Sequence, residues 1–216
     1  MRPTNSVRPV LSPRLVLIAA AAAAVLAGGA GGAVAAPAPP SAPPSVPSSA
    51  PSSHGALRPL AGLAADRLLV ADQVAAAKWG TDSPIDDPAR EQEVLDAVAE
   101  QAREVGGDPV ATSRIFRDQI QASKVVQRGL YRRWQADPAS APTERPDLAK
   151  VRLEINRING ELVHAIADSA DARTAPSCSA RLLAGALATG HEKRLDGLHA
   201  VALTRALPSV CETTAP

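Results

Sequence analysis

The sequence predicts an all-α fold, a helical bundle of about six helices with one long central helix and a C-terminal disulfide. Ala, Leu, Arg, Glu and Gln, which favour helices, dominate the second part of the chain, and aromatic residues make up only 2%. The alternation of apolar and polar residues that is typical of strands is missing. Apolar side chains recur every three or four residues, which is the spacing of one buried helix face.

The N-terminal residues predict export. Three arginines precede an apolar run from residue 15 to 26, and the small residues of 33–36 follow it. This layout is typical of a secretory signal peptide, and a membrane anchor is disfavoured because the run is short and no charged flank follows. We expect residues 1–35 to be cleaved off, leaving no membrane segment, and the mature chain to be secreted or extracytoplasmic.

The remaining residues divide into a linker and one domain. Residues 36–55 are almost entirely Pro, Ser and Ala, which cannot bury enough apolar surface to offset the entropy lost on ordering, so a disordered linker is expected. Residues 56–216 suit a single helical domain. Without the three signal-peptide arginines, the formal net charge of +1 becomes about −2, which argues against a nucleic-acid-binding protein.

The two cysteines fall in the exported part of the chain. In an oxidising compartment, Cys178 and Cys211 are expected to form a disulfide. A reactive thiol or a metal pair is the alternative, but two thiols alone do not complete a zinc site.

Start and stop signals separate the helices. Asp87-Pro88 and Asp108-Pro109 each combine an N-cap residue with a proline at the first helical position, and Asp147 is a third N-cap. Gly106-Gly107 is a stop signal. The expected helices span residues 57–79, 87–106, 108–135, 147–168, 177–188 and 191–207.

Four cations lie within or beside helical stripes that otherwise carry core residues. Arg67 lies inside the stripe of the first helix, and Lys78 lies at its end. Arg152 lies inside the stripe of the fourth helix, and Arg90 lies beside apolar residues of the second. Because an unpaired buried charge is strongly unfavourable, either carboxylates neutralise these cations or the bundle encloses a wet, positively lined pocket.

The spacing of these residues suits recognition of an anion. Arg67 and Lys78 are eleven residues apart, so they share a helix face with about 16 Å between their backbones. Ser123 and Gln127 interrupt an apolar face one turn apart and can present a hydroxyl and an amide to the same ligand. Glu91 can accept from a hydroxyl. No nucleophile elbow, phosphate-binding glycine loop or helical zinc motif is present, which favours binding and electrostatic stabilisation over covalent or metal-assisted catalysis.

The order of these residues resembles the all-helical chorismate mutases, in particular their exported, disulfide-bearing branch. The placements of Arg152, Cys178 and Cys211 are similar to that branch, and the resemblance covers most of residues 57–212. The family pattern is an arginine, a lysine eleven residues later, an arginine twelve beyond that, and Ser or Thr followed four residues on by Gln or Glu. The residues that meet this pattern are Arg67, Lys78, Arg90, Ser123 and Gln127.

The resemblance implies a pericyclic rearrangement of chorismate, a dicarboxylate of the shikimate pathway to aromatic amino acids, into prephenate without a cofactor. Arg67 and Arg152 would bind one carboxylate from two sides. Lys78 and Gln127 would donate hydrogen bonds to the ether oxygen, where negative charge grows as the carbon–oxygen bond breaks.

The same resemblance implies roles around the substrate's ring. Arg90 would orient the site near the ring substituents, and Ser123 would support the ring carboxylate. Glu91, together with the backbone near Asp87, would bind the ring hydroxyl. Some secreted relatives carry a polar side chain one turn after Arg90, whereas this chain has Val94, which can neither donate nor accept.

Two other functions stay open at this point: an isochorismate pyruvate-lyase-like enzyme using much of the same pocket, and a non-catalytic exported helical binding protein. A homodimer is compatible with the sequence, and Arg152 favours an active site completed within each chain.

Other polar and aromatic residues are expected to be structural or solvated. They are His164, His191 and His199, the core or pocket-rim residues Trp79, Tyr131 and Trp134, and a solvated face of Lys124, Arg128, Arg132 and Arg133.

Overall fold

The computed structural model describes residues 55–212, which form seven α-helices and one short 3-10 helix, with no strand in that range. The predicted all-α fold is therefore confirmed. No helix of the described range is both long and apolar enough to cross a membrane. The helices are α1 (Arg58–Lys78), α2 (Pro88–Glu104), α3 (Pro109–Ala136), α4 (Leu148–Asp168), α5 (Ala170–Thr174), α6 (Cys178–Glu192) and α7 (Gly197–Ala206), with η1 (Pro138–Ser140) between α3 and α4.

The expected signal peptide, residues 1–35, lies outside the described residues. The expected linker lies outside them as well, except for its last residue, Gly55. The first helix begins close to the expected start of the helical domain.

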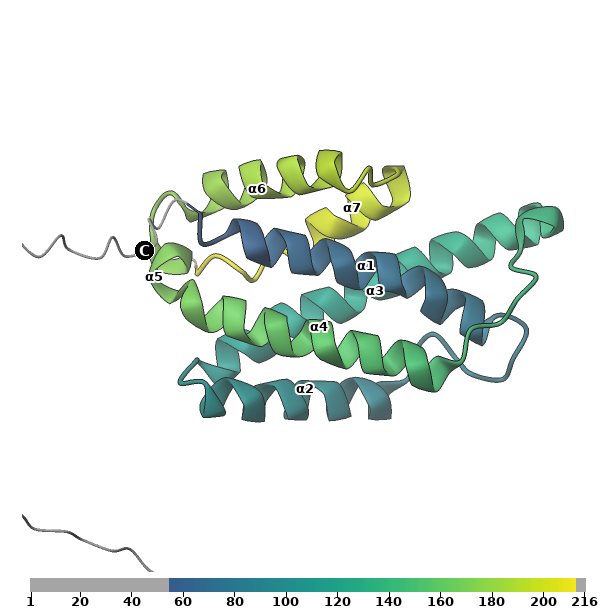
Figure 1. Cartoon of the computed structure of the whole chain (residues 1–216), viewed down its shortest axis with the longest axis horizontal. Helices are drawn as coiled ribbons and strands as arrows, with labels where there is room; N and C mark the ends of the chain where they lie inside the picture. The colour runs from purple at the N-terminus through teal and green to yellow at the C-terminus, as the bar shows by residue number, and fades with distance from the viewer. Residues whose placement is uncertain (1–54, 213–216) are drawn as a thin grey trace, which may run out of the picture. The chain divides into compact units, whose positions relative to one another are not determined.

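Helix α1 lies in the middle of the bundle and packs against α3, α4, α6 and α7. Figure 1 shows α2 and α6 at opposite edges, with α1, α3 and α4 between them. Residues on several sides of α1 are buried, many of them alanines, because neighbouring helices surround it. The single buried stripe expected for this helix is thus too narrow a description, since small side chains let the neighbours approach closely.

The N-cap predictions are confirmed. Asp87 accepts a hydrogen bond from the backbone of Arg90, Asp108 caps the first turn of α3, and Asp147 caps α4. These carboxylates satisfy amide groups that have no partner within the helix. Helix α2 ends as expected before Gly106, whose φ of 74° is a left-handed conformation that glycine adopts without strain.

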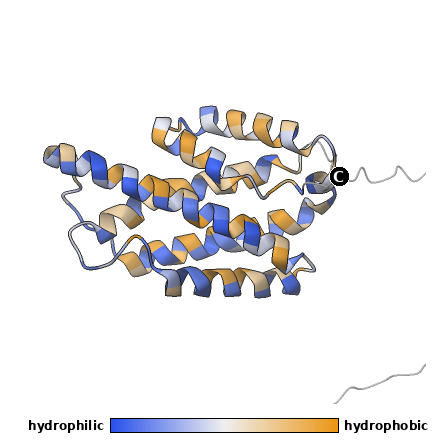
Figure 2. Ribbon diagram, turned by 180° about the vertical axis from the view of Figure 1, so that it is seen from behind, coloured by the Kyte–Doolittle hydropathy of each residue, from blue (hydrophilic) through white to orange (hydrophobic). Residues whose placement is uncertain are grey.

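The C-terminal helices differ from the sequence prediction. Helix α6 continues to Glu192, past the expected end at residue 188, and α7 begins only at Gly197. Asp196 is the N-cap of α7, where its side chain accepts from the backbone of His199. Arg194, with a φ of 51°, makes the turn between the two helices. Figure 2 shows hydrophobic and hydrophilic residues interleaved along α2, whereas much of α6 is hydrophobic or neutral.

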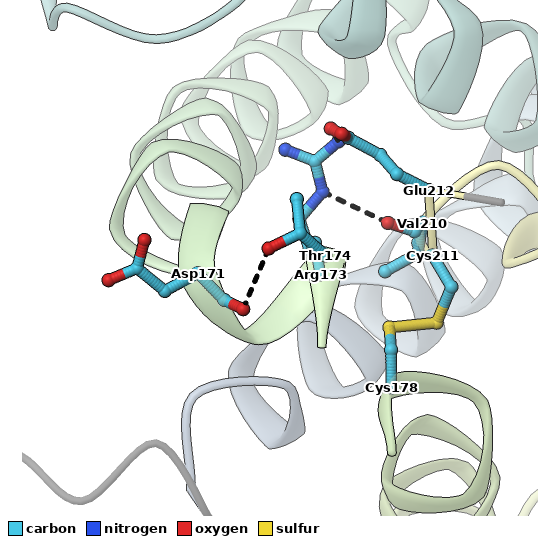
Figure 3. The surroundings of a disulfide bond; sticks show 7 residues. All are labelled: Asp171, Arg173, Thr174, Cys178, Val210, Cys211 and Glu212. Atoms are coloured by element: carbon cyan, nitrogen blue, oxygen red, sulfur yellow. Dashed lines mark hydrogen bonds and ion pairs between the residues drawn. A yellow bond between two sulfur atoms is a disulfide. The ribbon is translucent and has the colours of Figure 1, made fainter. Parts of the chain in front are cut away.

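The predicted disulfide is confirmed: Cys178 at the start of α6 is bonded to Cys211 in the C-terminal segment. Figure 3 shows Arg173 beside this bond, where its Nε donates to the carbonyl of Val210 at 3.0 Å and its Nη2 pairs with Glu212 at 2.9 Å. Closing a loop of 33 residues contributes about 3 to 4 kcal/mol in the chain-entropy model. A covalent bond and an ion pair together therefore fasten the C-terminal segment to α5 and α6.

His199 joins α1 to α7. Its Nδ1 lies 2.7 Å from Asp196, and its Nε2 lies 3.0 Å from Asp72 of α1. The hydrogen bond with Asp72 is the main cause that raises the pKa of His199 to about 9, and Asp196 adds to it against the opposing effect of burial. The buried His199 imidazolium forms structural ion pairs with these two carboxylates, which agrees with the structural role expected for this histidine.

The His199 ion pairs predict a pH-dependent stability. Because the pKa of about 9 in the folded chain lies above the ordinary value of 6.5, the stabilisation is complete below about pH 6.5 and is lost as the pH rises through 9. Both carboxylates are half exposed, so the contribution is about 1 to 3 kcal/mol. In urea unfolding, the stability difference between the wild type and His199→Gln should be large at pH 6.5 and small at pH 10. An equal difference at both values would contradict the assignment.

Candidate functional site

A cavity lies among α1, α2, α3 and α4 and encloses about 700 Å³ of space, part of it open to solvent. Five cationic side chains and two carboxylates line the cavity, which leaves an excess of positive charge. All eight residues predicted for substrate binding and catalysis line it: Arg67, Lys78, Asp87, Arg90, Glu91, Ser123, Gln127 and Arg152.

Arg67 of α1 is buried without a carboxylate partner among the described residues. It is 8% exposed, its Nε donates to Asn159 of α4 at 2.7 Å, and its guanidinium carbon lies 5.6 Å from the centre of the Phe116 ring. Its Nη1 is buried and has no hydrogen-bond partner within residues 55–212. Burial lowers the pKa of Arg67 to about 10, so the side chain is still charged at neutral pH. A buried cation with an unused donor is suited to an anionic ligand.

Lys78 is the last residue of α1, where the segment leading to α2 begins. Its Nζ donates to the carbonyl of Pro84 at 2.7 Å, so one of its three donor positions is used by the protein. Burial lowers the pKa of Lys78; Asp87 opposes that effect and Arg152 adds to it. Lys78 is half-buried and lines the cavity, so the remaining N–H donors of its ammonium are available to a ligand there.

Gln127 and Ser123 of α3 are hydrogen-bonded to each other. The Gln127 Nε2 donates to the Ser123 Oγ at 3.1 Å, while the Gln127 Oε1 is buried and has no hydrogen-bond partner in the described part of the chain. The two ends of an amide have nearly the same shape, so its orientation follows from the available hydrogen bonds. Turning this amide by 180° would let the Ser123 hydroxyl donate to Oε1 and would leave Nε2 free to donate to a ligand.

The two outer arginines differ from the expectation for core positions. Arg90 pairs with Glu93 of its own helix at 2.7 Å, and its side chain is 38% exposed. Arg152 is exposed, although its position in the sequence predicted a buried stripe. The prediction was wrong on this point because α4 turns the side of Arg152 toward the solvent-open part of the cavity. Arg152 has no hydrogen bond or ion pair with another residue of 55–212, so its guanidinium is available to a ligand.

The acidic residues of the cavity are partly used by the protein. Asp87 caps α2, and its backbone N–H donates to the Glu91 Oε1 at 3.3 Å. The same oxygen of Glu91 lies 2.6 Å from the Nζ of Lys124. Glu91 is therefore a paired carboxylate, with its side chain only 23% exposed.

Lys124 was missed by the sequence prediction. The sequence predicts a solvated face for it, but it is 8% exposed and lines the cavity. Ion pairs with Asp86 and Glu91, which come from another part of the chain, offset the cost of burying its charge. The helical spacing carried a signal, because Lys124 is four residues after Ile120 and three before Gln127, both on the cavity side of α3.

The aromatic residues stand beside the cavity as a separate cluster. The ring centres of Trp79 and Tyr131 are 4.8 Å apart, and those of Trp79 and Trp134 are 5.2 Å apart, each pair in an edge-to-face arrangement. Trp134 is buried, so the expected core or rim position of these residues is confirmed. Within residues 55–212, no three His, Cys, Asp or Glu side chains are grouped as a metal site would require.

Comparison with known proteins agrees with this arrangement. Residues 59–128 match the family model described as chorismate mutase type II. The chain is 38% identical over 160 residues to the secreted chorismate mutase of Mycobacterium tuberculosis, covering 74% of this chain and 80% of that protein. It is 37% identical over 155 residues to the secreted chorismate mutase of Mycolicibacterium smegmatis, covering 72% of this chain and 86% of that protein.

Solved structures are similar over the same region. The chorismate mutase from Burkholderia phymatum matches with a TM-score of 0.70 and 33% identity, covering 74% of this chain and 98% of its own. The chorismate mutase from Burkholderia thailandensis matches with a TM-score of 0.69 and 38% identity, covering 73% of this chain and 99% of its own.

Proposed function

The chain belongs to the secreted chorismate mutases, isomerases that convert chorismate to prephenate, and we propose that the cavity around Arg67, Lys78 and Gln127 is its active site. Chorismate carries two carboxylates, an ether bridge and a ring hydroxyl. The reaction breaks a carbon–oxygen bond and forms a carbon–carbon bond within one molecule. It therefore needs no nucleophile from the protein, and a site of fixed hydrogen-bond donors suffices.

One substrate carboxylate binds between Arg67 and Arg152. The observation that carries this proposal is the buried Arg67 Nη1. It has no hydrogen-bond partner among the residues that the structure describes, and it belongs to a cation whose protein partner is the neutral Asn159. A carboxylate there satisfies the donor and neutralises the charge in one step. Arg152 reaches the carboxylate from the solvent side and restricts its orientation.

The ether oxygen lies between Lys78 and Gln127. As the carbon–oxygen bond breaks, this oxygen gains negative charge, and donors fixed in advance stabilise it more in the transition state than in the ground state. The ammonium of Lys78 is held by the Pro84 carbonyl, and the amide of Gln127 is held by Ser123. In the productive orientation, the Ser123 hydroxyl donates to the Oε1 of Gln127, and Nε2 faces the ether oxygen.

The remaining groups hold the ring. Arg90 lies near the second anionic group of the substrate. Ser123 is hydrogen-bonded to Gln127 and lies on the same side of the pocket. Glu91 and the backbone at Asp87 are the acceptors for the ring hydroxyl. Because all of these residues belong to one chain, each protomer of any oligomer carries a complete site.

The direct test of this function is turnover by the purified full-length protein. Chorismate absorbance should fall with saturable kinetics, and the product should be an isomer of the substrate with the properties of prephenate. Release of pyruvate would contradict the mutase assignment, and absence of turnover would contradict the enzymatic one. Arg90→Ala should abolish the signal if the cavity is the active site.

Removing the Lys78 ammonium should lower kcat by about 100-fold or more, by analogy with the loss of one oxyanion donor. The measurement is steady-state turnover of chorismate by Lys78→Ala at neutral pH. Lys150→Ala is the matched control, since Lys150 is exposed and does not line the cavity. If Lys78→Ala keeps most of its activity, Lys78 has no part in the mechanism.

The neutral amide of Gln127 should give an activity that varies little between mildly acidic and neutral pH. A glutamate at this position must be protonated to donate a hydrogen bond, so Gln127→Glu should shift the optimum downward. Gln127→Met, which has a similar size and no donor, should be weakly active at every pH. A Glu variant as active as the wild type at pH 8 would rule out the donor role.

A further inference from the structure

Lys124 is a charged residue of the cavity to which the mechanism above gives no task. Its side chain is 10% exposed and its Nζ lies 2.6 Å from the Oε1 of Glu91 and 3.1 Å from the Oδ1 of Asp86. Burial acts against its charge, but the bonds to Glu91 and Asp86 outweigh this effect and raise the pKa of Lys124. It is therefore a permanent cation that joins α3 to the start of α2 and to the segment before it.

The two oxygens of Glu91 have different surroundings. Oε1 lies 2.6 Å from Lys124 and 3.3 Å from the backbone nitrogen of Asp87. Oε2 has no hydrogen bond with any residue between 55 and 212, and Glu91 lines the cavity. One oxygen is thus fixed by a cation and a backbone donor, and the second is free to accept.

We propose that Lys124 is a positioning residue: it holds Glu91 by Oε1 so that Oε2 accepts the hydrogen bond of the substrate's ring hydroxyl. This inference rests on the proposed function, because it concerns the same substrate. The Lys124 ammonium also offsets the charge of Glu91.

Arg128 provides a matched control on the same helix. It lies one turn after Lys124 and, like Lys124, bonds to Asp86, with both carboxylate oxygens at 2.7 Å from its Nη2. It does not line the cavity around Glu91. Removing either cation changes the charge near Asp86 by one unit, but only the loss of Lys124 releases Glu91.

The experiment compares two substrates across these variants. Turnover is measured with chorismate and with a chorismate analogue in which hydrogen replaces the ring hydroxyl. Lys124→Met should lower kcat/KM for chorismate by about 10- to 100-fold, the loss of one charge-assisted hydrogen bond, and should change turnover of the analogue by less than about 3-fold. Lys124→Arg should restore part of the loss, and Arg128→Met should leave the ratio between the two substrates unchanged.

Any other result overturns the inference. An equal loss on both substrates, or no loss on chorismate, means that Lys124 does not act through the hydroxyl. Melting curves identify folded variants, and Lys124→Gln is the second neutral substitution. If neither neutral variant folds, Lys124 is a structural residue and the positioning role is wrong. If the wild type does not convert chorismate, the proposed function is wrong as well. If the wild type converts chorismate but the variants do not behave as expected, only the positioning role of Lys124 is wrong.

Discussion

The constraint on which the cavity depends is that Arg67 keeps its charge inside the bundle without an ion-pair partner among residues 55–212. Asn159 accepts from one of its nitrogens, the Phe116 ring lies against its guanidinium, and Nη1 has no hydrogen-bond partner in the described range. Arg173 shows the opposite arrangement: it is also buried, at 2% exposed, but Glu212 neutralises its charge. The paired Arg173 fastens the C-terminal segment. The positive charge of Arg67 is not neutralised by an ion pair, so a ligand carboxylate can neutralise it.

The other polar groups of the cavity differ in the same way, in whether an opposite charge neutralises them. Lys78 and Gln127 are held by a backbone carbonyl and a serine, neither of which neutralises charge, so the donors keep their strength for a ligand. Glu91 is instead paired with Lys124, which limits the negative charge of the cavity. The central place of α1 matters as well, because surrounding helices fix both Arg67 and Lys78 on one rigid element.

Much of this arrangement could be predicted from the sequence, because the signals are local. The caps at Asp87, Asp108 and Asp147 define three helices, and helical spacing brings Arg67 and Lys78 to one face. The short α5 and the boundary between α6 and α7 were missed, since tertiary contacts such as those of Arg173 and His199 stabilise them. Lys124 was missed for the same reason: its two carboxylate partners lie more than 30 residues earlier in the chain.

The most direct test of the central claim is a calorimetric titration of prephenate, the dicarboxylate product, into the wild type and Arg67→Met. Methionine fills much of the space of Arg67 without its charge, so loss of the buried carboxylate contact should weaken binding by about 100-fold or more, the cost of leaving one partner of a buried ion pair unmatched. Equal affinity in the two proteins would contradict the claim that the unpaired charge of Arg67 is what the ligand completes.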